Sequence, residues 1–290
     1  MNEVAALDLG GSHVSAARVD LERRALSGSL TRISFGSDAS RAELIEAICH
    51  AACSVASAGD LLGVAAPGPF DYERGVCKVR GLAKLEALYD VDLRSELATA
   101  VGPMTESVFL NDAEAFALGE AWAGAARGHA RVVAITLGTG LGSGFLANGA
   151  VVTSGTTVPP GGNLHLASFR GAPVEETISA RGILRRHPGR PDGVLELATS
   201  ARAGDGVAAK LFEQLGADLG QFLAPSLQRF EATCLVVGGS ISRAWDLFGP
   251  SLEQSLASTP GLVTIAPAAN TDESPLLGAS LFASGRSPWF

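Results

Sequence analysis

Short apolar runs alternate with polar turns through the first quarter of the chain, a pattern that predicts a strand-rich beginning. Apolar residues dominate 4–9, 13–19 and roughly 26–34, and the turns GGS and DLERR separate these runs. We therefore expect three strands in a meander. Ser40 then precedes a stretch in which apolar residues recur at helical spacing, and the buried run LLGVAA at 61–66 follows. The expected order is strand, strand, strand, helix, strand.

The middle of the chain is less regular and then returns to the same alternation. An irregular stretch at 80–93 precedes a predicted helix near 93–101, and the apolar run SVFL at 107–110 predicts another strand. The sequence NDAEAFALGEAWAG at 111–124 then has the composition of a helix.

The second half of the chain repeats the opening plan. VAALDLGGSHVSAARVD can be laid over VVAITLGTGLGSGFLANG, because each has an apolar strand ending in Leu-Gly, a turn of small residues and a second strand. This match predicts an internal duplication. Further elements are expected as helices at 206–224, 242–257 and 274–285, as strands at 234–239 and 262–266, and as an insertion with little regular structure at 153–195.

Composition narrows the class of protein. A chain of 290 residues with 47% hydrophobic content is long enough for two domains. The net charge of −8 without a basic run argues against nucleic acid as a partner. Four scattered cysteines form no CxxC pair, so neither a disulfide framework nor a cysteine zinc site is indicated. The apolar runs are far shorter than the ~20 residues of a membrane helix, and no basic signal-peptide start is present, so we expect a cytoplasmic protein without membrane contact.

Two glycine turns could hold an anion. LDLGGSH and LGTGLGSG each place bare backbone between strands, where several amides can point at one phosphate. They match neither a Walker A loop nor a dinucleotide fingerprint, and tight hairpin geometry is the simpler alternative for each. A third pair, VVGGSIS, lies between a strand and a helix, where backbone can approach a nucleoside or phosphate. Asp8 beside the first turn could organise Mg²⁺ through water, or could only cap the turn.

One carboxylate stands where chemistry is possible. Asn111 and Asp112 lie between an apolar strand and a helix, and Asn111 with Glu114 fits a helix capping box. Asp112 then stands at the carboxyl end of a strand, where α/β proteins bind ligands. A carboxylate there could accept the proton of a hydroxyl that attacks a phosphoryl group.

These motifs together resemble the bacterial ROK family of repressors and sugar kinases, within the actin and hexokinase superfamily. The motifs LDLGGSHVSAARVD, GVAAPGPFD, FLNDAEAFALGEAWAG, ITLGTGLGSGFLANG and LVVGGSIS occur in the family's order. The resemblance implies an α/β protein with two ribonuclease H-like lobes, mixed sheets flanked by helices, and sugar and ATP in a cleft between the lobes. It implies lobes at 1–111 and 112–274, with the final helix, about 275–290, returning to the first lobe.

The resemblance also implies roles for single residues. Asp112 matches the catalytic base, Asn111 binds neighbouring sugar hydroxyls, Gly68 in the APGP turn lines the sugar site, and Asp8 organises Mg²⁺. His13 stands where many relatives carry lysine. The residues implied for ATP are Gly10, Gly11, Ser12 and His13 of the first motif, Gly138, Thr139 and Gly140 of the second, and Gly238 and Gly239 of the adenosine motif.

The sugar-binding segment departs from the family. Relatives carry Gly-Glu-x-Gly-His and a cysteine cluster that binds structural zinc, whereas this chain reads PPGGNLHLASFRGAPVEETIS. His165 matches the family histidine, and no structural zinc is expected. Asn163 is the nearest polar replacement for the missing glutamate if one residue of the family's spacing is deleted. Glu175 matches a glutamate that contacts the sugar, with Glu176 as the alternative register. The missing carboxylate therefore predicts a preferred sugar that differs from glucose at the anomeric or 2-position, and an N-acyl hexosamine, mannose, fructose and allose are all compatible.

Three hypotheses about function follow. The leading one is an ATP-dependent, Mg²⁺-requiring hexose kinase, with homodimerisation expected from the family. A catalytically silent sugar sensor is the second; the repressors of the family carry a DNA-binding domain before the first strand, and this chain is expected to lack one. The third is a glucokinase that takes polyphosphate as donor, although this acidic sequence shows no extended basic groove.

Overall fold

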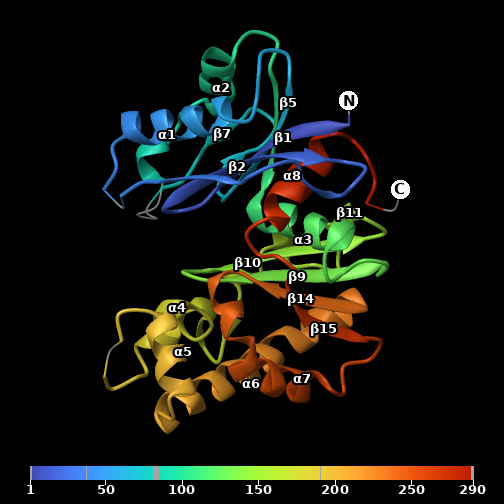
Figure 1. Cartoon of the computed structure of the whole chain (residues 1–290). Helices are drawn as coiled ribbons and strands as arrows, with labels where there is room; N and C mark the ends of the chain where they lie inside the picture. Colours follow the sequence, from blue (N-terminus) through green and yellow to red (C-terminus); the bar gives the residue numbers. More distant parts are fainter. Residues whose placement is uncertain (1, 37, 81–84, 190, 289–290) are drawn as a thin grey trace. The chain divides into compact units, whose positions relative to one another are not determined.

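The protein is an α/β chain with two compact units (Figure 1). The computed structural model describes residues 2–36, 38–80, 85–189 and 191–288. The first unit comprises Met1–Gly124 and Asp272–Phe290, and the second comprises Ala125–Thr271. Each unit has its own mixed sheet and its own apolar core.

The first unit contains a six-stranded sheet in the order β3-β2-β1-β5-β8, with β4 beside β2. Its strands are β1 (Glu3–Leu9), β2 (His13–Asp20), β3 (Ala25–Leu26), β4 (Thr31–Ser34), β5 (Leu61–Ala66) and β8 (Glu106–Asn111). β1 pairs antiparallel with β2, while β1, β5 and β8 run parallel. A separate small hairpin joins β6 (Phe70–Asp71) and β7 (Val76–Cys77).

Helices cover both faces of this sheet, as Figure 1 shows. The helices of this unit are α1 (Arg41–Cys53), α2 (Leu93–Val101), α3 (Asp112–Ala123) and α8 (Ser274–Ala283). Because strand side chains alternate, Leu7 of β1 packs in the core with α1, whereas Val4 packs with Leu277 of α8 and Trp122 of α3. The two faces of β1 therefore pack into two different apolar cores.

Most of the elements predicted in this half are present, with local differences. Ser40 caps α1, and its side chain and that of Glu43 form the two reciprocal bonds of a capping box. The strand expected at 26–34 is instead two short strands, β3 and β4, that both pair with β2, because Gly28 with φ of 102° breaks the run. Part of the irregular stretch expected at 80–93, residues 81–84, lies outside the described residues.

The second unit repeats the strand order of the first, in the order β11-β10-β9-β14-β15. Its strands are β9 (Arg131–Leu137), β10 (Leu141–Ala147), β11 (Ala150–Val151), β14 (Cys234–Gly238) and β15 (Thr264–Pro267). β9 pairs antiparallel with β10 and parallel with β14, as β1 does with β2 and β5. The shared topology agrees with the internal duplication that the two hairpin sequences predict.

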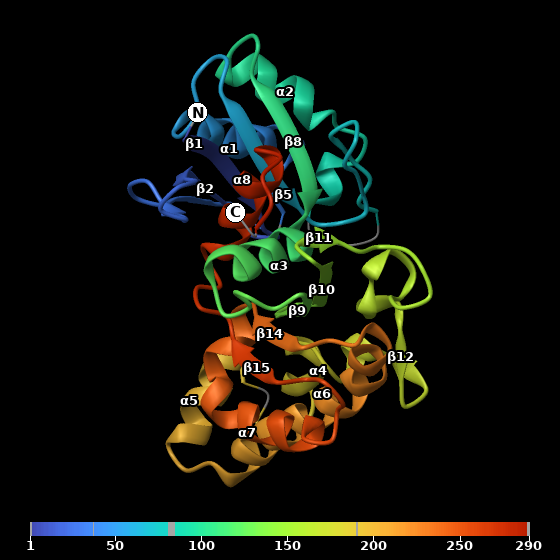
Figure 2. The ribbon, with the colours of Figure 1, turned by 90° about the vertical axis from the view of Figure 1, so that its right-hand side faces the viewer.

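Four helices pack on one face of the second sheet (Figure 2). They are α4 (Ala180–Leu184), α5 (Val194–Arg202), α6 (Gly206–Phe230) and α7 (Trp245–Leu256). α6 continues six residues past its predicted end at 224 with Pro225 inside it, because Leu227 and Phe230 beyond the proline are buried.

The insertion expected at 153–195 is more ordered than the sequence suggested. It contains a hairpin of β12 (Ser168–Phe169) and β13 (Ala172–Pro173), the short helix α4 and several 3₁₀ turns. α5, which follows it, was not predicted, although Leu197, Ala198 and Ala201 are buried at helical spacing. Its N-cap is Gly193, which offers no side-chain cap, so the usual start signal is missing.

The boundary between the units differs from the one expected after residue 111. α3 belongs to the first unit, because it packs closely against α8, and the second unit begins only at Ala125. The C-terminal helix α8 also packs on β1 and β5 of the first unit. No helix in the described ranges is both long and apolar enough to cross a bilayer.

Candidate functional site

In the first unit, the carboxyl ends of three parallel strands gather the predicted polar residues. Asp8 lies near the end of β1, the APGP turn follows β5, and Asn111 ends β8 with Asp112 directly after it. Parallel pairing in register places these ends at one edge of the sheet. This is the edge at which open α/β sheets bind ligands.

Asn111 holds the junction between β8 and α3. Its Oδ1 accepts from the backbone amides of Ala113 at 3.0 Å and Glu114 at 3.3 Å, so it caps the helix as expected. Its Nδ2 donates to the phenol oxygen of Tyr72 at 3.1 Å, and Tyr72 donates to the carbonyl of Ala66 at 3.2 Å. Tyr72 thereby joins Asn111 to the end of β5. Sequence reasoning missed Tyr72, because only the fold brings it to Asn111.

Asp112 occupies the first turn of α3. Its Oδ1 accepts from the Ala113 amide at 2.9 Å, and the residue is partly exposed. The helix N-terminus favours a negative charge at this position. Gly68 lies near the same group, since a Cβ added there would lie 3.4 Å from the Tyr72 hydroxyl. The structure thus places Gly68 and Asn111 beside the same Tyr72 hydroxyl, and Asp112 directly follows Asn111.

Asp8 lies in an excess of negative charge. Burial, together with the charges of Asp112 and Asp272, raises the pKa of its carboxyl to about 7, while the charge of Arg32 opposes the rise. Arg32 is paired with Asp272 at 3.3 Å and lies in the same cross-strand row as Asp8. The Asp8 carboxylate is an oxygen ligand of the kind that Mg²⁺ prefers, and a bound cation would offset the negative charge around it.

Protein side chains alone would not complete the coordination of a metal ion at Asp8. Across the described parts of the chain, no group of three or more His, Cys, Asp or Glu side chains is placed to hold a metal ion. Mg²⁺ at Asp8 would therefore depend on water and on oxygens of a bound ligand, which is how Mg²⁺ usually sits beside substrate phosphates.

Glu114, in the first turn of α3, also has a carboxyl group with a shifted pKa. Burial, together with the Asp112 charge, raises this pKa from the usual 4.5 to about 7, and a hydrogen bond from the Asn111 backbone opposes the rise. The folded protein therefore holds a proton at Glu114 that the unfolded chain releases between pH 4.5 and 7. The contribution of Glu114 to the free energy of unfolding is largest at low pH and is lost as the pH rises to 7.

Glu114→Gln should remove that pH dependence. We expect the variant to gain less at pH 5 than at pH 8, where it should be more stable than the wild type by about 1 kcal/mol after allowing for partial exposure. Urea unfolding at the two pH values measures the difference. Glu46→Gln on the exposed face of α1 is the control and should leave the pH slope unchanged. Equal stabilisation by Glu114→Gln at both pH values would contradict the prediction.

The first glycine turn connects β1 to β2. The Gly10 amide donates to the carbonyl of His13 at 2.9 Å, which closes the turn over Gly11 and Ser12. Ser12 Oγ lies 3.3 Å from His13 Nδ1. A Cβ at Gly10 would come within 3.3 Å of the His13 ring, so this glycine leaves room for the imidazole.

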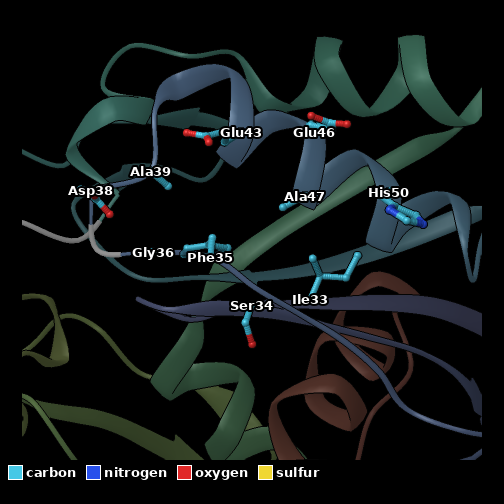
Figure 3. Close-up of a pocket in the computed structure, with 10 residues that line it drawn as sticks. All are labelled: Ile33, Ser34, Phe35, Gly36, Asp38, Ala39, Glu43, Glu46, Ala47 and His50. Atoms are coloured by element: carbon cyan, nitrogen blue, oxygen red, sulfur yellow. The ribbon is translucent and has the colours of Figure 1, made fainter.

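A pocket of about 470 Å³ lies next to this turn (Figure 3). β4 forms one wall and α1 the other, and Ser34 at its edge pairs with His13 in the sheet. Its lining residues are Ile33, Ser34, Phe35, Gly36, Asp38, Ala39, Glu43, Glu46, Ala47 and His50. None of the sequence-predicted site residues lines it.

In the second unit, the turn at 138–140 joins β9 to β10. The Gly138 amide donates to the Gly140 carbonyl at 3.0 Å, so the turn is as tight as expected for Gly138, Thr139 and Gly140. Glu175 reaches this turn, since its Oε1 accepts from the Leu141 amide at 2.8 Å. Glu176, by contrast, pairs with Arg185 at 3.7 Å. Of the two alternative registers, Glu175 is the carboxylate beside the glycine turn.

The adenosine-type motif lies beside the same turn. Gly238 ends β14, which is parallel to β9, and Gly239 has a φ of 82°. A Cβ at Gly239 would fall on the backbone of Leu137, so only glycine fits this approach. The Gly239 amide donates to Thr271 Oγ1 at 2.6 Å.

Asn163 and His165 belong to a segment tied down by a residue the sequence did not indicate. Ser143 of β10 is buried, and its hydroxyl donates to the Gly162 carbonyl at 2.6 Å and accepts from the Leu164 amide at 3.0 Å. These two bonds flank Asn163. His165 is exposed two residues later, where it is accessible to a ligand.

Comparison with known proteins identifies the family. A model of the ROK family matches residues 4–286. The chain belongs to the ROK family. Its relatives include the glucokinase of Thermotoga maritima, which is 31% identical over 278 residues, covering 86% of this chain and 85% of that enzyme.

Structures and further relatives of the ROK family extend this comparison. The crystal structure of the ROK hexokinase from Thermus thermophilus matches with a TM-score of 0.76 and 26% identity, covering 97% of this chain and 98% of that one. The DNA-binding transcriptional repressor Mlc of Escherichia coli is 24% identical over 216 residues, which cover 67% of this chain and 52% of Mlc. The matched regions of several other curated relatives cover about half the length of each of those proteins.

Proposed function

We propose that the protein is an ATP-dependent sugar kinase that transfers the γ-phosphoryl group of ATP to a hydroxyl of a hexose or hexose derivative. The observation that carries this proposal is the placement of Asp112. Asp112 follows the end of β8, directly after the helix cap Asn111, and it is close enough to Asp8 for its charge to raise the pKa of that carboxyl. Asp112, the candidate base, therefore lies near Asp8, the candidate carboxylate for organising Mg²⁺.

Asp112 acts as the general base in this proposal. The sugar hydroxyl oxygen attacks the γ-phosphorus, the bond from that phosphorus to the bridging β–γ oxygen breaks, and ADP leaves with the bond's electrons. The hydroxyl proton passes to the Asp112 carboxylate. Asn111 binds a neighbouring sugar hydroxyl, and its hydrogen bond to Tyr72 fixes the orientation of its amide.

The glycine turns bind the nucleotide in this proposal. The Gly10 and Gly138 amides close the two turns, and Gly11, Ser12 and Gly140 offer backbone amides to phosphate oxygens. Gly238 with Gly239 lets backbone approach the adenosine. Mg²⁺ held beside Asp8 would neutralise charge on the phosphates.

Three residues of the second unit recognise the sugar in this proposal. Asn163 offers an amide that both donates and accepts, His165 offers an exposed imidazole, and Glu175 offers a carboxylate. An amide binds sugar hydroxyls less strongly than a carboxylate does, because the charge-assisted bond is absent. Asn163 therefore favours a sugar whose hydroxyl at that subsite is replaced or differently oriented.

A sugar-sensing protein without turnover is the second candidate. The similarity to Mlc and the neutral Asn163 at the sugar segment favour it. Asp112 and both phosphate-type turns, which a pure sensor does not need, favour the kinase.

A coupled ADP-release assay tests the proposal. Mg-ATP is offered with a panel of glucose, mannose, fructose, allose and N-acyl hexosamines, and inorganic polyphosphate replaces ATP in a parallel set. We expect sugar-dependent ADP release with at least one member of the panel. Sugar-induced thermal stabilisation without ADP release would instead identify a sensor, and turnover with polyphosphate alone would overturn ATP as donor.

A further inference from the structure

A charged side chain is buried in the second unit, away from the groups assigned to chemistry. Asp218 lies on α6 with only 1% of its side chain exposed, between the buried residues Leu215 and Leu219. A buried carboxylate is costly unless charges and hydrogen bonds compensate it. Its partners therefore show what this position does.

Two arginines and an amide surround the carboxylate. Arg170 Nη1 lies 2.8 Å from Oδ1, and Gln214 Nε2 donates to the same oxygen at 2.8 Å. Arg186 Nη1 lies 3.5 Å from Oδ2. Both arginines keep part of their side chains in solvent, with 52% and 31% exposed, so only the aspartate is fully desolvated.

Arg170 connects Asp218 to the segment that carries the sugar residues. It lies at the tip of the β12–β13 hairpin, five residues after His165 and five before Glu175. Its Nη2 also donates to Gln221 Oε1 at 2.6 Å. Phe169 packs its ring edge to face with Phe222 of α6 at 5.8 Å between centroids, so the hairpin is docked on α6 by charge and by apolar contact.

Arg186 connects Asp218 to residues that follow Glu175 in the chain. Its Nη2 donates to the Thr177 carbonyl at 3.3 Å, and its Nε donates to the Gly182 carbonyl at 3.2 Å. Thr177 directly follows the 3₁₀ turn that contains Glu175. One carboxylate therefore holds, through two guanidinium groups, both the hairpin before Glu175 and the turn after it.

We propose that Asp218 is a positioning residue for sugar binding. Through Arg170 and Arg186 it fixes the segment 165–177 against α6, so that His165 and Glu175 are presented in one arrangement before the sugar arrives. Pre-ordering of this kind removes the entropy that binding would otherwise have to supply. The inference deepens the proposed function, on which it rests, and assigns Asp218 no contact with the sugar.

Asp218→Asn tests the proposal because it keeps the shape and removes the charge. We expect KM for the sugar to rise by about 10-fold or more, while KM for ATP stays within about 3-fold, since the nucleotide motifs lie elsewhere. Arg170→Gln should give a smaller rise in the same parameter. Glu213→Gln, on an exposed position of α6, is the matched control and should behave as the wild type.

Hydrogen exchange supplies a readout that does not depend on turnover. In Asp218→Asn we expect faster exchange of the amides in 165–177 and unchanged exchange in β9 and β10. If Asp218→Asn does not fold, Arg170→Gln carries the test, because its side chain is half exposed and leaves Asp218 paired with Arg186.

The outcomes separate this inference from the proposed function. An active wild type, with unchanged sugar KM and unchanged segment exchange in both variants, would overturn the positioning role. Equal losses in sugar KM, ATP KM and thermal stability would also overturn it, because they indicate a general structural role. A wild type without sugar-dependent ADP release would refute the kinase, while sugar affinity and segment exchange would still decide the role of Asp218.

Discussion

Replacing Asp112 by Asn is expected to lower kcat for sugar phosphorylation by about 10²-fold or more, the contribution of a positioned general base. The amide keeps the size of the side chain and its place in the first turn of α3, and it can still accept from the Ala113 amide. It cannot take a proton from the sugar hydroxyl. Sugar affinity should therefore change little, and the loss should fall on kcat.

Steady-state ADP release and sugar titration by calorimetry measure these two effects separately. Asp92→Asn is the matched control, because Asp92 caps α2 through the Ser95 amide in the same unit and Asn caps equally well. It should retain wild-type kcat. Near-normal turnover in Asp112→Asn would refute the base assignment, and loss of sugar binding together with kcat would indicate a binding role instead.

Gly278→Ala is expected to destabilise the protein by about 3 kcal/mol or more, the upper end of overpacking effects. Gly278 lies on α8 where this helix touches α3, and a Cβ there would fall on the backbone carbonyl of Ala115. Gly119 of α3 makes the reciprocal approach to Ser274. The backbone of neither helix can move away easily, because both also pack on the sheet or its buried core.

Helix propensity alone predicts the opposite sign, since Ala stabilises a helix interior by about 1 kcal/mol relative to Gly. Gly206→Ala at the start of α6 is the control, because a Cβ there meets nothing within 4 Å. It should be neutral or slightly stabilising. Chemical unfolding of both variants measures the difference, and equal stability of Gly278→Ala and the wild type would show that the two helices can separate without cost.

Much of the candidate site could be predicted because its residues are marked by local signals. Asn111 is a helix cap, and Gly239 adopts a positive φ that other residues avoid. Such features depend on a few neighbouring residues, and their types are readable from the sequence. The repeated hairpins were readable for the same reason, since each turn and its two strands are contiguous.

Residues whose roles depend on distant partners could not be predicted. Tyr72 meets Asn111 only because β6 follows β5 while β8 pairs with β5, and Ser143 meets Gly162 and Leu164 only because the insertion folds back on β10. Distant partners also explain why helix α5 was not predicted and why α6 is longer than predicted. Burial against the second core outweighs a missing cap and an internal proline.

The sequence by itself determined the α/β class, the duplicated strand order and the local features at the candidate site, namely the helix cap at Asn111 and the tight glycine turns, because alternation, glycine turns and caps act over a few positions. Only the tertiary structure decided that α3 belongs with α8 in the first unit, that Glu175 rather than Glu176 reaches the glycine turn, and that the buried Asp218 pairs with Arg170 and Arg186. The physical reason is that these outcomes depend on close packing and on the burial of charge. Both are set by groups far apart in the chain that meet only when the core forms.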